Sequence, residues 1–252
     1  MQEPKVNIHE IFRSFQAEGP LAGLPTTFIR FTGCDLACKW CDTVNTKIFD
    51  RFTPESCFAF FEGRGLQLDS LCFTGGEPTL RIAWIRDFIN LVRKFFNDAS
   101  TSCRTIFQLE THAMTPAAIN AAVAFYNSVC NASHAIPSIV CSPKLPSSLE
   151  DSEIAFDAAL RLVYGSDNPA FSLKLVIGCA ADFIYAFSKL RELYNLGPQF
   201  AKAMDEKGVF IQKEFSYSSY PEFLEALDTH TCPELMGAVR LSIQAHKYVG
   251  VS

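Results

Sequence analysis

Short runs of β-branched and aromatic residues alternate with stretches of helical periodicity along most of the chain. The clearest helical stretch runs from Ile82 to Phe96, and a second covers Ala181–Tyr194 with Ile184, Phe187 and Leu190 on its inner face. Six runs predict strands: Thr26–Thr32, Leu71–Thr74, Thr105–Thr111, Ser138–Ser142, Ser172–Ile177 and Val209–Lys213. This alternation is typical of βα units, so an α/β fold with a parallel sheet is predicted.

The length of 252 residues and the 48% hydrophobic content suit a single domain over residues 1–252. Two Thr-Pro pairs, Thr53-Pro54 and Thr115-Pro116, predict helix starts, because proline lacks an N–H where no intrahelical acceptor exists. The tail from Gly237 to Ser252 is expected to form a last strand or an extended segment that closes over the site.

The charge balance argues against direct nucleic-acid binding, since a net charge of -5 provides no basic field for a phosphate backbone. Residues 1–20 have no signal-peptide pattern, and no apolar run is long enough to span a membrane. A cytoplasmic protein without a membrane partner is therefore expected.

Ten cysteines are too few for a disulfide scaffold in a chain of this length, so reduced thiols are expected. Seven of them have no close-spaced partner and are predicted to be mostly small core residues: Cys57, Cys72, Cys103, Cys130, Cys141, Cys179 and Cys232.

The other three cysteines, Cys34, Cys38 and Cys41, lie within eight residues directly after the first predicted strand. Three thiolates can hold a 4Fe-4S cluster and leave one iron open, provided that no distant cysteine fills the fourth place. A zinc site completed by a histidine, or three unliganded thiols, are the alternatives.

The CxxxCxxC spacing with Trp40 before the third cysteine resembles the signature of the radical S-adenosylmethionine (SAM) superfamily. Thr74-Gly75-Gly76-Glu77-Pro78, after the second predicted strand, is similar to the superfamily's second element. The resemblance implies that Gly75, Gly76 and Glu77 contact SAM, and glycines permit a close backbone approach. An ordinary glycine-rich βα turn is the alternative for this segment.

Several further segments resemble one family, the 7-carboxy-7-deazaguanine synthases, over most of the chain. They are Phe15–Pro20, Gly23–Pro25, Phe28–Arg30, Cys41–Thr43 and Arg240–Lys247. Two positions depart from the family pattern: Ala17 replaces a glycine, and His112-Ala113 replaces the usual Asn-Gly. The second departure could alter a contact with substrate or SAM.

The resemblance implies an incomplete (β/α)6 barrel of the radical SAM type. It also implies a lyase reaction, in which SAM binds the open iron and is cleaved by one electron to a 5′-deoxyadenosyl radical. The radical would take a hydrogen from 6-carboxy-5,6,7,8-tetrahydropterin, whose ring contracts with loss of ammonia to 7-carboxy-7-deazaguanine. This product belongs to the biosynthesis of queuosine-type tRNA bases. A one-electron donor such as flavodoxin and a homodimer are further expectations.

Individual site residues follow from the same resemblance. Gln16 and Glu18 would read the pterin edge, and Arg30 would hold the substrate carboxylate with its planar fork. Asp42 and Thr43 offer oxygen ligands for Mg²⁺, although a helix cap would explain them too. The remaining candidates are Thr111, Gln244 and His246 for substrate, and Ser142 and Lys144 for SAM. His246 could equally be structural, and Lys144 could be a solvated loop charge.

Position supports this set independently, because the candidate segments follow the carboxyl ends of successive predicted strands, where α/β folds keep their sites. Two other functions stay open. One is an activating enzyme that places a glycyl radical on a partner protein, and the other is a non-catalytic zinc or iron–sulfur module.

Overall fold

The structure, a computed structural model, describes residues 5–41, 49–98, 104–131, 135–165, 168–217 and 219–244. Its strands are β1 (Val6–Phe15), β2 (Pro25–Phe31), β3 (Asp50–Phe52), β4 (Ser70–Gly75), β5 (Thr105–Thr111), β6 (Ala135–Cys141), β7 (Phe171–Ile177), β8 (Val209–Lys213) and β9 (Val239–Ser242). Its helices are α1 (Pro54–Arg64), α2 (Ile82–Asp98), α3 (Pro116–Cys130), α4 (Glu153–Tyr164), α5 (Ala180–Asn195), α6 (Pro198–Lys207), α7 (Tyr220–His230) and α8 (Pro233–Met236), with short 3-10 helices η1 (Gly19–Leu21), η2 (Pro78–Arg81) and η3 (Pro146–Ser148).

All nine strands form one sheet in the order β3-β1-β2-β4-β5-β6-β7-β8-β9. Strands β2 and β4 to β9 run parallel, and β1 is antiparallel to both β2 and β3. All six predicted strands are present, and β9 is the last strand expected in the C-terminal tail. The helix caps are confirmed as well, since Thr53 and Thr115 each accept a backbone N–H three residues on.

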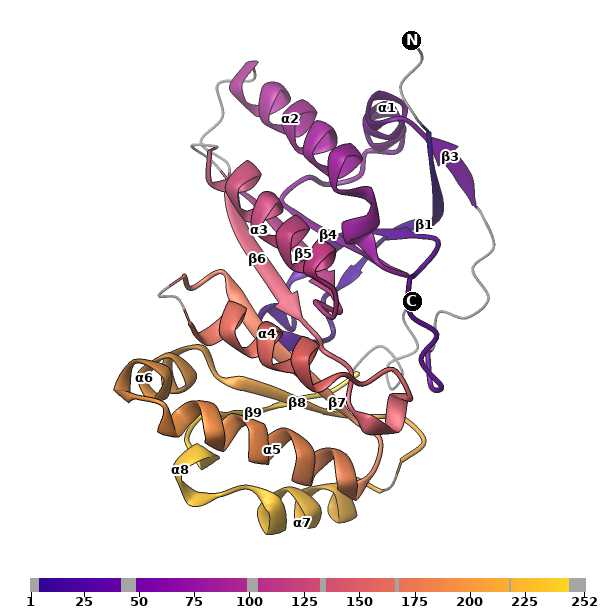
Figure 1. The fold of residues 1–252 in the computed structure, drawn as a ribbon. Coiled ribbons are helices and arrows are strands. Elements are labelled where there is room, and N and C mark those ends of the chain that lie inside the picture. The colour runs from indigo at the N-terminus through magenta and orange to yellow at the C-terminus, as the bar shows by residue number, and fades with distance from the viewer. Residues whose placement is uncertain are drawn as a thin grey trace.

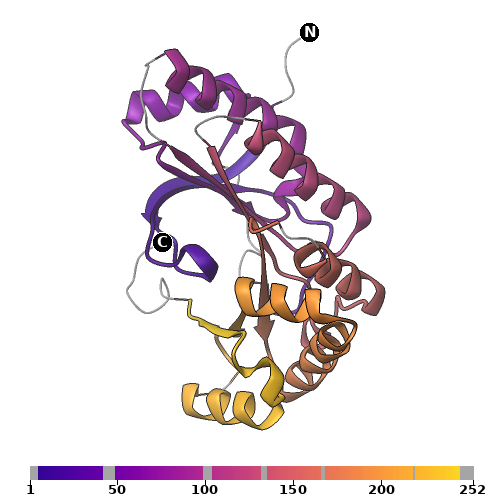
Figure 2. The same ribbon diagram turned by 90° about the vertical axis from the view of Figure 1, so that its left-hand side faces the viewer.

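The sheet curves into an open half-barrel with the long helices on its outer face (Figures 1 and 2). Among the described residues the sheet does not close, because β3 and β9 remain its two edges. Figure 2 shows η1 on the concave side, where the Gly19 N–H donates to Ser242 Oγ of β9 at 3.0 Å. The predicted incomplete barrel is therefore confirmed, with an antiparallel extension through β1 and β3 that the sequence did not predict.

The core lies between the sheet and the outer helices, and alternate strand residues enter it. Leu71 and Phe73 of β4 are completely buried, as are Phe88 and Ile89 of α2. The prediction for Ile184 is wrong, because its side chain is 58% exposed on the outer side of α5. None of the described helices is long and apolar enough to cross a membrane.

Candidate active site

A cavity of about 260 Å³ opens on the concave side of the half-barrel. It is bordered by β1, β2, the loop that carries the three cysteines, and the carboxyl ends of β4 to β8. The predicted site residues among its lining are Gln16, Glu18, Arg30, Cys34, Cys38, Cys41, Gly75, Gly76, Thr111, Ser142, Lys144 and Gln244. Asp42, Thr43 and His246 lie outside the described residues, so their predicted roles stay predictions.

Cys34, Cys38 and Cys41 all carry free thiols that face this cavity. Burial raises the pKa of the Cys34 and Cys38 thiols, and the Lys144 ammonium opposes this effect at Cys38. Binding iron would therefore release protons from these side chains. None of the other cysteines in the described part of the chain lines the cavity, so three local thiolates and one open corner suit a 4Fe-4S cluster.

The remaining cysteines only partly follow the prediction of core positions. Cys57, Cys72 and Cys141 are buried, whereas Cys130 is exposed. The two others that the structure describes, Cys179 and Cys232, are partly exposed. Cys103 lies outside the described residues.

Three hydrogen bonds hold the cysteine loop, two to η3 and one to Glu150 just after it. The Lys39 N–H donates to the Ser148 carbonyl at 2.9 Å, and the Ala37 N–H donates to the Glu150 carboxylate at 3.0 Å. The Trp40 ring N–H donates to Ser147 Oγ at 3.1 Å. The aromatic residue of the cysteine motif thus anchors the loop to a segment more than a hundred residues further along the chain.

Asp182, at the start of α5, fixes Ser147, the residue that accepts the Trp40 hydrogen bond. Its buried carboxylate accepts hydrogen bonds from the Ser147 N–H at 2.9 Å, the Ser147 hydroxyl at 2.5 Å and the Gly178 N–H at 2.7 Å. Since Ser147 in turn accepts from Trp40, the carboxylate fixes the position of the cysteine loop without touching it.

The two glycines at the end of β4 allow a close approach to the cysteine loop itself. A Cβ on Gly76 would lie 2.0 Å from the carbonyl oxygen of Gly33, the residue before Cys34. A Cβ on Gly75, whose φ is +115°, would lie 2.3 Å from the Phe31 carbonyl oxygen. Both glycines also border the cavity, so their predicted contact with SAM stays a prediction beside the observed protein contact.

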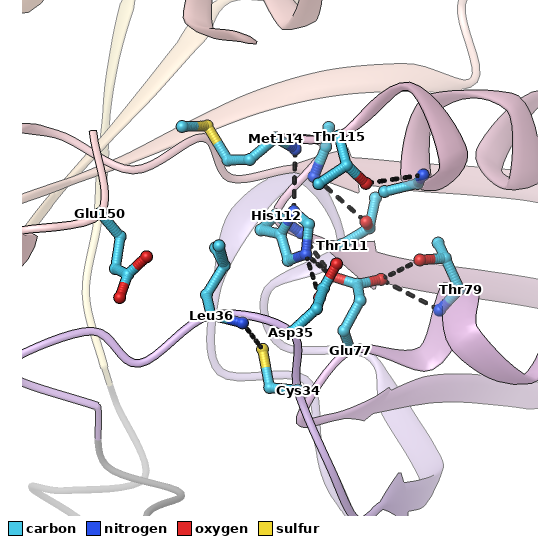
Figure 3. A network of polar contacts seen from close by, with 12 residues as sticks. Cys34, Asp35, Leu36, Glu77, Thr79, Thr111, His112, Met114, Thr115 and Glu150 are labelled. Carbon is cyan, nitrogen blue, oxygen red and sulfur yellow. Dashed lines mark hydrogen bonds and ion pairs between the residues drawn. The ribbon is translucent and has the colours of Figure 1, made fainter. Parts of the chain in front are cut away.

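Glu77 serves the protein's own structure (Figure 3). Its side chain is 1% exposed and does not line the cavity. One carboxylate oxygen accepts from the Thr79 N–H and hydroxyl at 3.0 and 2.6 Å, and the other accepts from the His112 N–H at 2.9 Å. Its predicted role in binding SAM stays a prediction.

His112, one of the two departures from the family pattern, also joins this network (Figure 3). Its Nδ1 accepts the Met114 N–H at 2.8 Å, which leaves the proton on Nε2 when the ring is neutral. Nε2 lies 2.8 Å from the Asp35 carboxylate, so the ring connects β5 to the residue after Cys34. The following Ala113 takes a φ of +52°, a conformation that favours glycine.

Gln16, Glu18 and Arg30, three of the residues predicted for substrate, line what we term the substrate end of the cavity. The Gln16 amide donates to Gln108 at 2.5 Å and to Glu110 at 3.1 Å, and it accepts the Glu18 N–H at 3.2 Å. Gln16 therefore holds the loop that presents Glu18. Arg30 bonds Glu10 through Nε at 2.6 Å and lies over the Phe12 ring.

Several lining residues were not predicted from the sequence, among them Glu110, Lys174 and Gln212. Each directly follows a strand residue that is buried in the core (Leu109, Leu173 and Ile211), and a polar side chain at the next position indicates the concave face. Phe12 and Phe28 add an apolar wall, with stacked rings 5.0 Å apart.

Comparisons with known proteins support the same family as the motifs. The chain is 33% identical over 99 residues to a 7-carboxy-7-deazaguanine synthase from Thermoplasma acidophilum, covering 33% of this chain and 41% of that protein. It is 42% identical over 79 residues to one from Haemophilus influenzae, covering 31% and 36%. In these matches the chain spans about two fifths of the relatives' length. No protein-family model matches it.

The whole fold is similar to a crystal structure of QueE from Escherichia coli. The TM-score is 0.58 with 20% sequence identity, over 95% of this chain and 93% of that one. A likeness at this level of identity shows the fold alone, and it extends the correspondence beyond the segments matched by sequence.

We expect Asp182→Asn to lower the free energy of unfolding by about 1–3 kcal/mol, because an amide NH₂ would face a buried donor that the carboxylate now satisfies. Chemical denaturation would measure the change. Asp157→Asn is the matched control, since Asp157 is 43% exposed and its ion pair with Lys189 spans 3.9 Å. Equal effects of the two substitutions would contradict the role assigned to Asp182.

Proposed function

We propose that this protein is a radical SAM lyase that converts 6-carboxy-5,6,7,8-tetrahydropterin to 7-carboxy-7-deazaguanine. The observation that carries the proposal is one cavity that is lined by three free thiols together with Glu18 and Arg30. The similarity to named 7-carboxy-7-deazaguanine synthases selects this reaction among those of the superfamily.

Cys34, Cys38 and Cys41 would hold the 4Fe-4S cluster, with Lys144 balancing negative charge beside them. Burial lowers the pKa of the Lys144 ammonium, and the neighbouring Cys38 and Cys34 thiolates oppose this effect. When bound, the cluster and SAM would supply the radical chemistry. Gly75, Gly76, Thr111 and Ser142 line the same cavity as the cysteines, where they would contact SAM or substrate.

At the substrate end, Glu18 would accept ring N–H groups and Arg30 would bind the carboxylate. Gln16 would position Glu18 as well as face the ring, and Gln244 would complete the wall after β9. The Phe12 and Phe28 rings offer an apolar surface beside Arg30 for a flat heterocycle.

Further parts of the proposal rest on the family resemblance. They are a Mg²⁺ ion at Asp42 and Thr43, a substrate contact of His246, a flavodoxin-type electron donor, a homodimer, a cytoplasmic location and a place in queuosine-type base biosynthesis. We also propose one domain over residues 1–252, with residues 237–252 closing the pocket. The cavity contact of Gln244 supports that closing role.

One observation favours a second candidate, a zinc-binding module. Ligand atoms of Cys34, Asp35 and His112 all lie within 4.8 Å of one another, and sulfur, nitrogen and oxygen donors suit Zn²⁺. This donor set would use one cluster cysteine and leave Cys38 and Cys41 without a role. Metal analysis after anaerobic purification separates the two candidates, because zinc without iron would favour the module.

The decisive experiment is an anaerobic product assay with the reconstituted protein, SAM, a reductant and 6-carboxy-5,6,7,8-tetrahydropterin. We expect 7-carboxy-7-deazaguanine to form together with 5′-deoxyadenosine. SAM cleavage without any deazaguanine product would rule out the specific reaction and leave a different radical SAM enzyme.

Arg30→Ala is expected to keep SAM cleavage and to lower product formation by about 100-fold. Without the guanidinium, the substrate carboxylate is no longer bound and the ring is no longer aligned with the radical. The two products can be quantified from the same reaction. Arg13→Ala is the matched control, since Arg13 of β1 makes a similar ion pair with Asp69 but does not line the cavity. Equal loss of SAM cleavage and product would instead indicate a structural role for Arg30.

A further inference from the structure

Lys174 stands in the middle of β7, on the concave face of the sheet, and lines the cavity. Its side chain is 10% exposed, and its Nζ lies 2.5 Å from Glu18 Oε2. The flanking strand residues Leu173 and Leu175 are completely buried in the core on the other face. The lysine is thus a buried cation that β7 directs to the substrate end.

Fold stability alone gives little reason for this ion pair. Removing two charges from water costs about as much as their attraction returns, and apolar replacements of buried pairs are often neutral or stabilising. The loop that presents Glu18 is also held in place on both sides of this residue. Gln16 accepts the Glu18 N–H, and the next residue, Gly19, donates to Ser242 of β9. A fixed charge pair in a cavity wall is a feature of a binding site.

A carboxylate beside an ammonium presents two acceptors followed by a donor. The edge of a 2-amino-4-oxo pyrimidine ring presents the complementary order, which is an amino N–H, a ring N–H and a carbonyl oxygen. An ammonium has three donors, so a bond to Glu18 does not exhaust it. The spacing of Nζ and Oε2 is close to that of neighbouring polar atoms on such a ring edge.

We propose that Glu18 and Lys174 together read a 2-amino-4-oxo heterocycle, with Glu18 accepting its two N–H groups and Lys174 donating to the 4-oxo oxygen. The inference rests on the proposed function and specifies how the substrate is recognised. Lys174 becomes the residue that selects a 4-oxo ring over a 4-amino ring.

Recognition of the pyrimidine ring by Glu18 and Lys174 suits the chemistry of a ring contraction. The pyrimidine half of a pterin is retained in a deazaguanine, and only the other ring is rebuilt. Holding the unchanged half at Glu18 and Lys174 leaves the reacting half free to face the cysteine end of the same cavity. Substrate and product would then share one anchor throughout the reaction.

The test measures dissociation constants by anaerobic calorimetry on the reconstituted, SAM-bound protein at neutral pH, where the pterin ring keeps its N–H. Three stable ligands are compared: 6-carboxypterin, its 2,4-diamino analogue with the same carboxylate, and pterin without the carboxylate. Wild-type protein should prefer the 4-oxo over the 4-amino ring by about 10- to 100-fold, the range of a hydrogen bond to a charged group. Absence of that preference in the wild type overturns the proposal without any variant.

Lys174→Met should lower the preference and leave only the part set by Glu18, because the 4-amino ring lacks the ring N–H that Glu18 would accept. Lys174→Arg should restore part of the loss because the donor is kept. If Lys174→Met weakens both carboxylated rings equally, the lysine does not read position 4. If its effect disappears with the ligand that lacks a carboxylate, Lys174 binds the carboxylate instead. Either result overturns the inference.

The product assay separates this inference from the proposed function. If the wild type forms deazaguanine while Lys174→Met keeps the full wild-type preference for the 4-oxo ring, the reaction assignment is supported and the proposed role of Lys174 is wrong. If the wild type prefers the 4-oxo ring through Lys174 but forms no deazaguanine, the role of Glu18 and Lys174 in recognition is supported and the assigned reaction is wrong.

Discussion

Cys38→Ala is expected to reduce SAM cleavage to background and to leave the fold intact. Cys38 faces the cavity between Cys34 and Cys41, and two thiolates cannot hold a 4Fe-4S cluster in place. The side chain is only partly buried, so the free energy of unfolding of the metal-free protein should change by about 0.5 kcal/mol or less. Iron content, the optical spectrum of the cluster and 5′-deoxyadenosine formation measure the loss.

Cys130→Ala is the matched control for this prediction. Cys130 is an exposed cysteine at the end of α3, outside the cavity lining. It should retain iron and SAM cleavage at the wild-type level. Retained turnover in Cys38→Ala would contradict the assignment of the three ligands and, with it, the open iron corner.

The βα part of the fold could be predicted from the sequence because each parallel strand is a short apolar run between turn signals. The strand β1 could not be predicted in this way. Its register shifts between Ile8 and Glu10, which breaks the two-residue alternation that marks a half-buried strand. The three-residue β3 is too short to leave any pattern.

The cluster end of the site was predictable because its residues are adjacent in sequence. Cys34, Cys38 and Cys41 fall within eight positions, and their predicted place after β2 is confirmed. The supports of that loop were not predictable. Trp40 reaches Asp182 only through Ser147, and nothing in the spacing of these residues indicates that they meet.

At the substrate end, too, contacts between residues far apart in the sequence could not be predicted. Glu18 and Lys174 are separated by 156 residues and meet only because the half-barrel brings η1 against the concave face of β7. A partial signal does exist in the strands. Lys174, Glu110 and Gln212 each interrupt an apolar run at a position that faces away from the core helices. Reading both faces of each strand would have identified a polar barrel interior.

Gly76→Ala is expected to abolish cluster assembly and to destabilise the protein by about 1–3 kcal/mol, the usual range for overpacking. The added methyl would lie 2.0 Å from the Gly33 carbonyl oxygen, and a backbone atom cannot move aside as the end of a flexible side chain can. Two hydrogen bonds join the same segments, from the Gly76 N–H to the Phe31 carbonyl and from the Glu77 N–H to the Gly33 carbonyl. Relief of the clash must therefore shift the chain that leads into Cys34.

Gly63→Ala makes the same chemical change where there is room for it. Gly63 lies in α1, and nothing stands within 4 Å of the position its Cβ would take, so this variant should be slightly more stable than wild type. Thermal unfolding of the metal-free proteins separates destabilisation from loss of the cluster, and iron content with SAM cleavage reports on the loop. Full iron loading and wild-type SAM cleavage in Gly76→Ala would mean that the cysteine loop does not depend on its contact with the end of β4.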